Sequence, residues 1–285
     1  MKHIVIPFLA LLMLCACQKA SIYDDEPKPE TKPNLIVNVF EIEQTPFSDI
    51  TRAEPAEACT RLNFLVYDME DKRVKYVNQQ VGEEDFGTAS FQLDEGDYYL
   101  VVVAHSSDGN PTTTNPVKIQ FTNKQGYSDT FLSSGIINIG SDLLEQKVHL
   151  DRITALCRFV ITDDYPDDVA RMRFYYTGGS GAFDSTTGFG NVNSKQTVFF
   201  DVADGQKQFD LYTFPHDIEG TIHLLVTALD AEDNVIKEHE FDVPITQNKI
   251  TWLSGPYFTG SHSGSTTVSA VNINTEWAGE IHLTF

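Results

Sequence analysis

The sequence has 285 residues, in which 41 aspartate and glutamate residues outnumber 20 lysine and arginine residues, for a formal charge of −21 at pH 7. This excess of negative charge repels the phosphates of nucleic acids and of anionic lipids, so it excludes a nucleic-acid-binding protein and a protein held on membranes by basic side chains. The acidity suits a protein that stays dispersed in a crowded medium outside the cell. The length is typical of two domains.

The N-terminal residues have the pattern of an export signal. Lys2 is followed by an apolar run, Ile4 to Leu14, that is too short to span a bilayer. The run ends in the sequence Leu-Cys-Ala-Cys, which fits a bacterial lipobox. We therefore expect cleavage between Ala16 and Cys17, removal of residues 1–16, and attachment of diacylglycerol and palmitate to Cys17. The alternative is an ordinary secretory signal in which Cys17 is incidental, but no better small-residue cleavage site follows before the polar linker.

Lipid on Cys17 predicts a protein held on the outer membrane and facing the cell exterior. Each buried methylene contributes ~0.8 kcal/mol, and about two acyl chains give stable attachment. No other segment of the sequence is apolar enough to span a membrane. Residues 17–33 are acidic and rich in proline around Asp24–Pro29, so we expect a linker that holds the first folded element away from the lipid.

From residue 34 onward the sequence predicts strands. Apolar, β-branched or alternating runs occur at Leu35–Phe40, Leu62–Asp68, Tyr98–Ala104, Ile153–Ile161, Met172–Tyr176, Val198–Phe200, Phe209–Tyr212, Ile222–Leu229, Phe241–Ile245 and Ile281–Phe285. No window of a dozen residues has a helical period. We predict an all-β fold of two sandwich domains, residues 34–150 and 151–285, with a loop from Glu43 to Ala58.

The sequence has no convincing catalytic, metal or cofactor pattern. Gly178–Ala182 resembles a degraded nucleophile elbow, but the residues after it do not form the helix that such an elbow requires. The histidines lie at no metal-ligand spacing, and adjacent carboxylates point to opposite faces of a strand. We therefore expect no enzyme activity, no metal and no cofactor. Cys59 and Cys157 either form one disulfide or are separate buried residues, and the strand-like runs beside them favour burial.

Five segments carry a resemblance to a known family. They are Ser21–Asp25, Leu65–Asp68, Leu93–Tyr98, Asn248–Phe258 and Trp277. Together they resemble the fimbrillin-associated anchor proteins of Bacteroidetes, the FimB/Mfa2 group of the fimbrillin superfamily. The resemblance implies two tandem transthyretin-like β-sandwich domains. It also implies a fimbrial anchor, accessory or tip subunit, with other fimbrial subunits as partners and no enzyme activity.

The resemblance also implies assembly by strand exchange between subunits. A sandwich that lacks one strand exposes an apolar groove and unpaired backbone groups, and a donated strand satisfies both. Our candidate strand-exchange residues are Leu35, Val37 and Val39 near the N-terminus and Ile281, Leu283 and Phe285 at the C-terminus.

In the related stalk subunits, the resemblance implies proteolysis after an arginine in the loop that follows the first strand. Arg52, followed by Ala53, is the corresponding candidate here. A cut at this point would separate Cys17 from the rest of the protein. Anchoring and cleavage are therefore alternatives unless the severed strand stays bound.

A second interpretation is a glycan-binding lipoprotein of a polysaccharide-uptake system, also built from β-sandwich domains. Its expected mark is a shelf of exposed aromatic side chains beside Asn or Asp residues. The sequence identifies neither a host ligand nor a glycan ligand.

Overall fold

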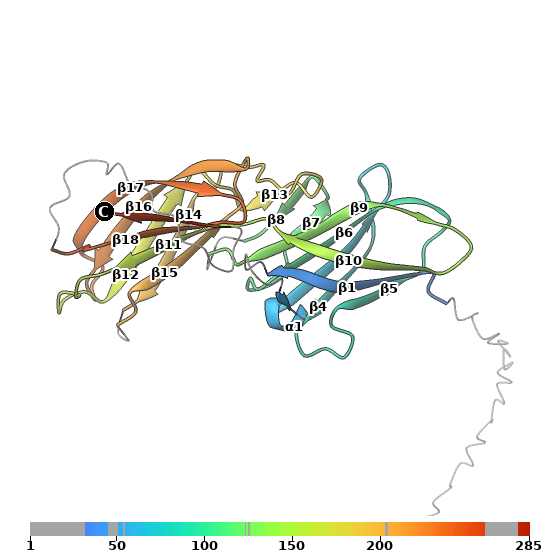
Figure 1. Ribbon diagram of the computed structural model, residues 1–285, viewed down its shortest axis with the longest axis horizontal. Coiled ribbons are helices and arrows are strands. Elements are labelled where there is room, and N and C mark those ends of the chain that lie inside the picture. The colour runs from blue at the N-terminus through green and yellow to red at the C-terminus, as the bar shows by residue number, and fades with distance from the viewer. Residues whose placement is uncertain are drawn as a thin grey trace, which may run out of the picture. The chain divides into compact units, whose positions relative to one another are not determined.

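A computed structural model describes residues 32–44, 51–53, 55–122, 124, 126–202, 205–259 and 279–285. Ala16, Cys17 and Trp277 lie outside these ranges, so the signal-peptide and lipidation predictions stay predictions. The described residues form strands, apart from the single four-residue helix α1 (Pro55–Ala58) and the connecting turns, which confirms the all-β prediction (Figure 1). Within the same ranges, no helix has the length and apolar character needed to cross a bilayer.

Eight of the strands before residue 153 form one large sheet. It comprises β1 (Leu35–Gln44), β2 (Thr51–Ala53), β3 (Arg61–Tyr67), β4 (Arg73–Gln80), β5 (Thr88–Phe91), β6 (Gly96–His105), β9 (Thr130–Ile139) and β10 (Leu144–Arg152). Their order is β2-β1-β10-β9-β6-β3-β4, and β5 pairs with β1. Side chains from β1, β5 and β10 share one buried apolar cluster with side chains from β3, β6 and β9, so the sheet folds back on itself around a core.

The strands after residue 154, apart from one two-residue strand, form two further sheets. One has the order β15-β11-β18-β19 and the other β14-β12-β16-β17. Their bounds are β11 (Ala155–Ile161), β12 (Arg171–Thr177), β14 (Gln196–Asp201), β15 (Gln208–Thr213), β16 (Glu219–Leu229), β17 (Val235–Thr246), β18 (Ile250–Gly255) and β19 (Glu280–Thr284). Both sheets contribute to a second core, in which Phe159 contacts the rings of Phe174, Phe241 and Phe285.

A fourth sheet joins segments that are far apart in the sequence. It consists of β7 (Thr112–Asn115), β8 (Lys118–Gln120) and β13 (Ala182–Phe183), in the order β13-β8-β7. A third apolar cluster includes Leu65 and Val101 of the large sheet together with Phe183 and Phe214. Residues on both sides of the expected boundary at Leu150 therefore share a core, and the division into domains at that position stays a prediction.

The segment expected to be a loop between Glu43 and Ala58 contains regular structure. Strand β1 continues to Gln44, and Thr51–Ala53 form β2, in which Arg52 pairs with Glu43. The loop prediction was therefore wrong at Arg52, because the short strand returns along β1 and gives its backbone groups partners.

Cys59 and Cys157 are both buried and are not joined by a disulfide, which excludes the disulfide and confirms burial. Cys59 belongs to the core of the large sheet and Cys157 to the core of the two later sheets. Burial raises the pKa of each thiol to about 12. Both side chains therefore act as small apolar core residues.

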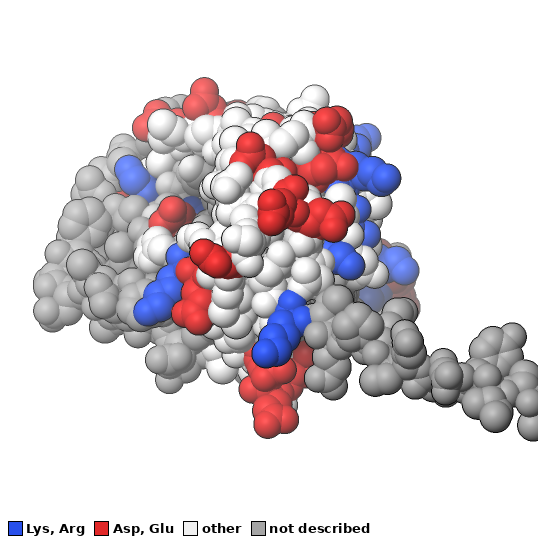
Figure 2. Space-filling view, turned by 90° about the vertical axis from the view of Figure 1, so that its right-hand side faces the viewer, with Lys and Arg blue, Asp and Glu red and all other residues white. Residues whose placement is uncertain are grey.

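Acidic side chains are numerous on the surface but are not segregated from basic ones. On the face shown in Figure 2, Asp and Glu side chains are interspersed with Lys and Arg side chains. This face therefore presents mixed charge rather than a continuous basic patch.

Candidate functional site

The first group of strand-exchange candidates lies inside the large sheet. Strand β1 pairs in parallel with β10 from Leu35 to Ile42 and antiparallel with β5 from Leu35 to Asn38. Figure 1 shows β1 between these two strands. Leu35 and Val37 are fully buried, as is Ile42. Strand β1 thus has backbone partners on both sides, and its buried side chains pack in the core of the large sheet.

The candidate cleavage site follows directly on this strand. Arg52 and Ala53 lie in β2, whose backbone pairs with the end of β1. A cut after Arg52 would release no strand by itself, because β1 would still be paired with β10 and β5. Cleavage at Arg52 stays a prediction.

The second group of candidates lies in β19, in a different sheet from β1. Ile281 and Leu283 belong to β19, which pairs in parallel with β18 and ends the strand order of its sheet. Leu283 and the following Phe285 are buried, and the Phe285 ring stacks on Phe159 at 5.1 Å. Among the described residues, β19 is therefore an edge strand whose apolar side chains complete a core.

A row of side chains on the outer face of the same sheet also holds β19. The Arg158 guanidinium donates to both carboxylate oxygens of Asp210, at 2.7 Å each, and lies 4.8 Å from the Trp252 ring centre. The Trp252 ring stacks on His282 at 5.4 Å, and His282 contacts Glu280 at 3.0 Å. The row thus crosses all four strands and ends on β19.

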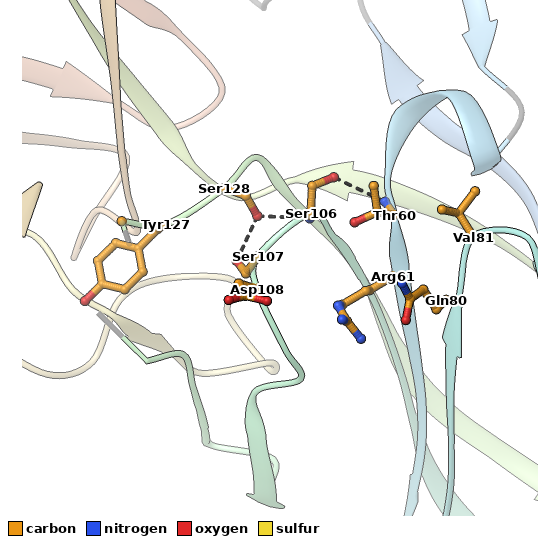
Figure 3. Close-up of a pocket in the computed structure, with 10 residues that line it drawn as sticks. Thr60, Arg61, Gln80, Val81, Ser106, Ser107, Asp108, Tyr127 and Ser128 are labelled. Atoms are coloured by element: carbon orange, nitrogen blue, oxygen red, sulfur yellow. Dashed lines mark hydrogen bonds between the residues drawn. The ribbon is translucent and has the colours of Figure 1, made fainter. Parts of the chain in front are cut away.

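A polar pocket of about 410 Å³ lies at one end of the large sheet. It is lined by Thr60, Arg61, Gln80, Val81, Ser106, Ser107, Asp108, Gly126, Tyr127 and Ser128. In the view of Figure 3, the Arg61 guanidinium lies between Asp108 and Gln80, and the Tyr127 ring points away from them. Four chain segments therefore meet here: the start of β3, the end of β4, the turn after β6, and the residues before β9.

Hydrogen bonds among hydroxyl groups tie these segments together. The Ser107 and Ser128 hydroxyls are 2.9 Å apart, and the Ser128 hydroxyl also accepts the Ser106 N–H at 3.0 Å. The Ser106 hydroxyl in turn accepts the Thr60 N–H at 3.2 Å. These hydrogen bonds therefore join the turn after β6 to Thr60, just before β3, and to Ser128, just before β9 (Figure 3).

A buried polar network lies beneath the turn. The Ser107 N–H donates to Nδ1 of His105 at 3.2 Å, so Nε2 carries the proton and donates to Oδ1 of Asn63 at 3.0 Å. The Asn63 amide donates to Asn78 at 2.9 Å and to Asn110 at 3.0 Å. Burial, assisted by the charge of Arg61, lowers the pKa of His105 to about 3, so the ring is neutral. A satisfied network of this kind fixes the turn.

The pocket has the groups of a binding site rather than those of a nucleophilic active site. The serine hydroxyls bond to one another, and both nitrogens of the nearby His105 are already engaged, so no base contacts a hydroxyl here. Ser180, the serine of the elbow-like segment, is fully buried and bonds to Ala182. Within the described ranges, no three His, Cys, Asp or Glu side chains gather as metal ligands.

Sequence reasoning missed the pocket. Its lining residues come from four short stretches that are up to 68 positions apart, between Thr60 and Ser128, and no local spacing connects them. The turn chemistry of Asp108–Asn110 is visible in the sequence, but by itself it predicts no ligand. The residues that fix the turn, His105 and Asn63, lie within apolar runs and gave no separate signal.

Comparison with solved structures supports the fold. The chain is similar to a "putative adhesin" from Bacteroides ovatus, with 15% identity and a TM-score of 0.51 over 81% of this chain and 88% of that chain. At this identity the likeness shows the fold alone.

Two further solved structures are similar at lower TM-scores. One is a fimbrial assembly protein from Parabacteroides distasonis, with 14% identity and a TM-score of 0.42 over 87% of this chain and 97% of that chain. The other is the fimbrial anchor protein Mfa2 from Porphyromonas gingivalis, with 14% identity and a TM-score of 0.40 over 72% of this chain and 80% of that chain. The solved structures similar to this chain thus include a fimbrial assembly protein and a fimbrial anchor protein.

No curated protein matches the sequence. A family model does match, from residue 31 to residue 284, and it therefore covers every described strand. The chain belongs to DUF6562, a family of unknown function.

Proposed function

We propose that this protein is a non-catalytic subunit of a surface fimbria, an anchor, accessory or tip subunit, held in the outer membrane by lipid on Cys17. It joins other subunits by strand exchange. The lipobox at Cys17, the all-β fold and the two terminal strands support this proposal. The names of the similar solved structures, which include adhesins and a fimbrial anchor protein, agree with it.

The observation that carries the proposal is the position of β1. Tension on a lipid at Cys17 would reach the folded chain at Leu35, the first residue of β1. Because β1 pairs with β10 on one side and β5 on the other, the backbone hydrogen bonds on both sides must shear together before the strand leaves. The rate of that unfolding step governs resistance to force. Such a strand suits the attachment point of a tethered fibre.

The arrangement also separates the two predicted roles of the termini. Strand β1 is an inner strand, and its removal would open a groove between β10 and β5. Strand β19 is an edge strand with a single strand partner, β18, in the described part of the chain. Exchange of an edge strand breaks backbone hydrogen bonds on one side only. We therefore assign anchoring to β1 and subunit exchange to β19.

Lipid attachment is tested by labelling cells with an alkyne analogue of palmitate and comparing two variants. We expect wild type and Cys15→Ala to carry the label and to sediment with outer membranes. Cys17→Ala should lose the label and leave the membrane fraction. Cys15→Ala is the matched control because it alters the neighbouring cysteine of the same signal. Membrane attachment of unlabelled Cys17→Ala would contradict the proposal.

A glycan-binding lipoprotein remains the second candidate, and one observation favours it. Phe199 on β14 is 52% exposed, and the Arg171 guanidinium lies 5.8 Å from its ring centre. Arg171 also pairs with Asp233, and these residues border a surface hollow of about 310 Å³. An exposed ring beside planar polar groups could stack on a sugar, although this is one ring rather than the expected shelf. Retention of the protein on a polysaccharide gel, lost in Phe199→Ala, tests this candidate.

A further inference from the structure

We propose that the polar pocket at the end of the large sheet binds one neutral, hydroxyl-rich sugar residue of a surface glycan. The inference does not depend on the fimbrial function, because it rests on the pocket alone. The volume of about 410 Å³ falls within the ~300–1,000 Å³ range of small-molecule sites.

The first argument is the state of Arg61. Its side chain is half-buried and lines the pocket, yet its guanidinium has no hydrogen bond or ion pair with any described residue. A guanidinium has five N–H donors in a fixed, planar arrangement. Because these donors line the pocket and are not engaged by described residues, they are available to a ligand. Oxygen atoms of a ligand would supply the missing acceptors.

The second argument is the balance of charge. Asp108 lines the same pocket, so the lining includes one cationic and one anionic side chain. A carboxylate ligand that met Arg61 would also approach Asp108, and like charges repel. Hydroxyl groups avoid this conflict, because each can accept from the guanidinium and donate to the carboxylate. A neutral ligand is therefore favoured over an acidic one.

The third argument is the chemistry of the remaining lining. Four side-chain hydroxyls and the Gln80 amide border the pocket, whereas Val81 is the one aliphatic side chain among the lining residues. The Tyr127 ring is largely buried against Phe214, at 6.1 Å, and is turned away from the pocket. A peptide would need apolar anchor pockets, which this lining lacks. A polyol has the required number of donors and acceptors.

The fourth argument is rigidity. Hydrogen bonds to the hydroxyls of Ser106 and Ser128 connect the segments before β3, after β6 and before β9. The His105 network fixes the turn that carries Asp108. A site whose groups are already held in place loses little conformational entropy when a ligand binds.

The probes are free glucose, galactose, mannose, fucose and N-acetylglucosamine at millimolar concentration, with sialic acid and galacturonic acid as charged sugars. Binding to the full-length lipoprotein in detergent is measured by saturation-transfer NMR, and the dissociation constant is measured by titration. We expect at least one neutral sugar to bind, and Arg61→Ala and Asp108→Asn each to weaken that binding at least tenfold. Arg61→Lys should weaken it as well, because it keeps the charge but loses the planar donor arrangement.

Ile218→Ala is the matched control, because it truncates a side chain that is 60% exposed and lines neither this pocket nor the hollow beside Phe199. It should leave the dissociation constant unchanged. Neither Arg61 nor Asp108 has a side-chain hydrogen bond to a described residue, so both variants should retain the circular dichroism spectrum and thermal midpoint of the wild type. The proposal is overturned if none of the neutral sugars binds, if only the charged sugars bind, or if Phe199→Ala abolishes binding and the pocket variants do not.

Discussion

Gly255, the last residue of β18, is a position at which the backbone leaves no room for a side chain. A Cβ there would lie 2.3 Å from the carbonyl oxygen of Phe285 and 2.9 Å from its ring. The contact allows the end of the chain to return to its own core, where Phe285 stacks on Phe159. A glycine that precedes a proline suggests a turn in the sequence, but its contact with a residue 30 positions later is visible only in the structure.

Gly255→Ala should destabilise the protein by about 1–3 kcal/mol, the usual cost of overpacking a core, because the new methyl group must displace Phe285. Gly135→Ala, in β9, is the matched control, since a Cβ there meets nothing within 4 Å. Urea unfolding measures both variants. Equal stability of the two would show that the end of β19 is not packed as described.

Asp163 is a second residue with a specific role, since it caps the turn after β18. Its carboxylate accepts the N–H groups of Tyr257, Phe258 and Thr259 at 2.7–2.8 Å and the Thr259 hydroxyl at 3.1 Å. Burial alone would raise the pKa of this carboxyl, but the four hydrogen bonds outweigh it and hold the pKa below its ordinary value.

A lowered pKa in the folded state means that Asp163 stabilises the protein above the unfolded pKa of about 3.9, and that this contribution is lost as the pH falls through the lower folded value. We expect Asp163→Asn to cost about 1–2 kcal/mol at pH 7, by loss of charge-assisted hydrogen bonds. The difference from wild type should shrink below about pH 4. The exposed Asp142→Asn is the control. A difference that does not change with pH in urea unfolding between pH 7 and pH 2.5 would contradict this role.

At the scale of elements, strands with long apolar or alternating runs were predictable from the sequence. The run Tyr98–Ala104 was expected to be buried on both faces, and residues 100, 102 and 104 of β6 enter one core while 101 and 103 enter another. Short strands were not predictable, because the two or three residues of β2, β8 and β13 contain no period. Their conformation is set by a partner strand, as β1 sets that of β2.

The inner position of β1 makes a prediction about the candidate cleavage site. After cutting with an arginine-specific protease, the peptide that ends at Arg52 should remain bound to the rest of the chain, since β10 and β5 still hold β1. Size-exclusion chromatography followed by mass spectrometry detects both pieces in one peak. Arg52→Lys, which the protease does not cut at this position, is the control. Separation of the pieces without denaturant would show that β1 leaves readily and would favour a processed, polymerising subunit.

At the scale of the whole molecule, the all-β class and the strand-rich halves were predictable, whereas the connection between them was not. The rings of Phe121 and Phe214 stack at 5.7 Å, and the rings of Phe183 and Phe214 lie 5.0 Å apart in a tilted arrangement. Arg152 donates to Asp129 at 2.9 Å and to Asn248 at 3.3 Å. These partners are separated by 23 to 96 positions, and no local pattern reports such contacts.

Phe214→Ala tests whether the halves depend on this shared cluster. Because Phe214 is fully buried, the substitution should cost about 3–5 kcal/mol. Hydrogen exchange should show lost protection in both β6, which contributes Val101 and Val103 to the cluster, and β15, whose Tyr212 packs against it. The exposed Phe199→Ala should change neither. Loss of protection in only one of the two strands would show that the halves fold independently.

The identity and acylation of the N-terminal residue in the protein isolated from fimbriae test the central claim most directly. Intact-mass and N-terminal analysis of chains recovered with fimbriae and outer membranes distinguishes the two states. The account predicts a chain that begins at acylated Cys17 and continues uncut through Arg52 into β3. A population that begins at Ala53 and has lost the segment from Cys17 to Arg52 would contradict it.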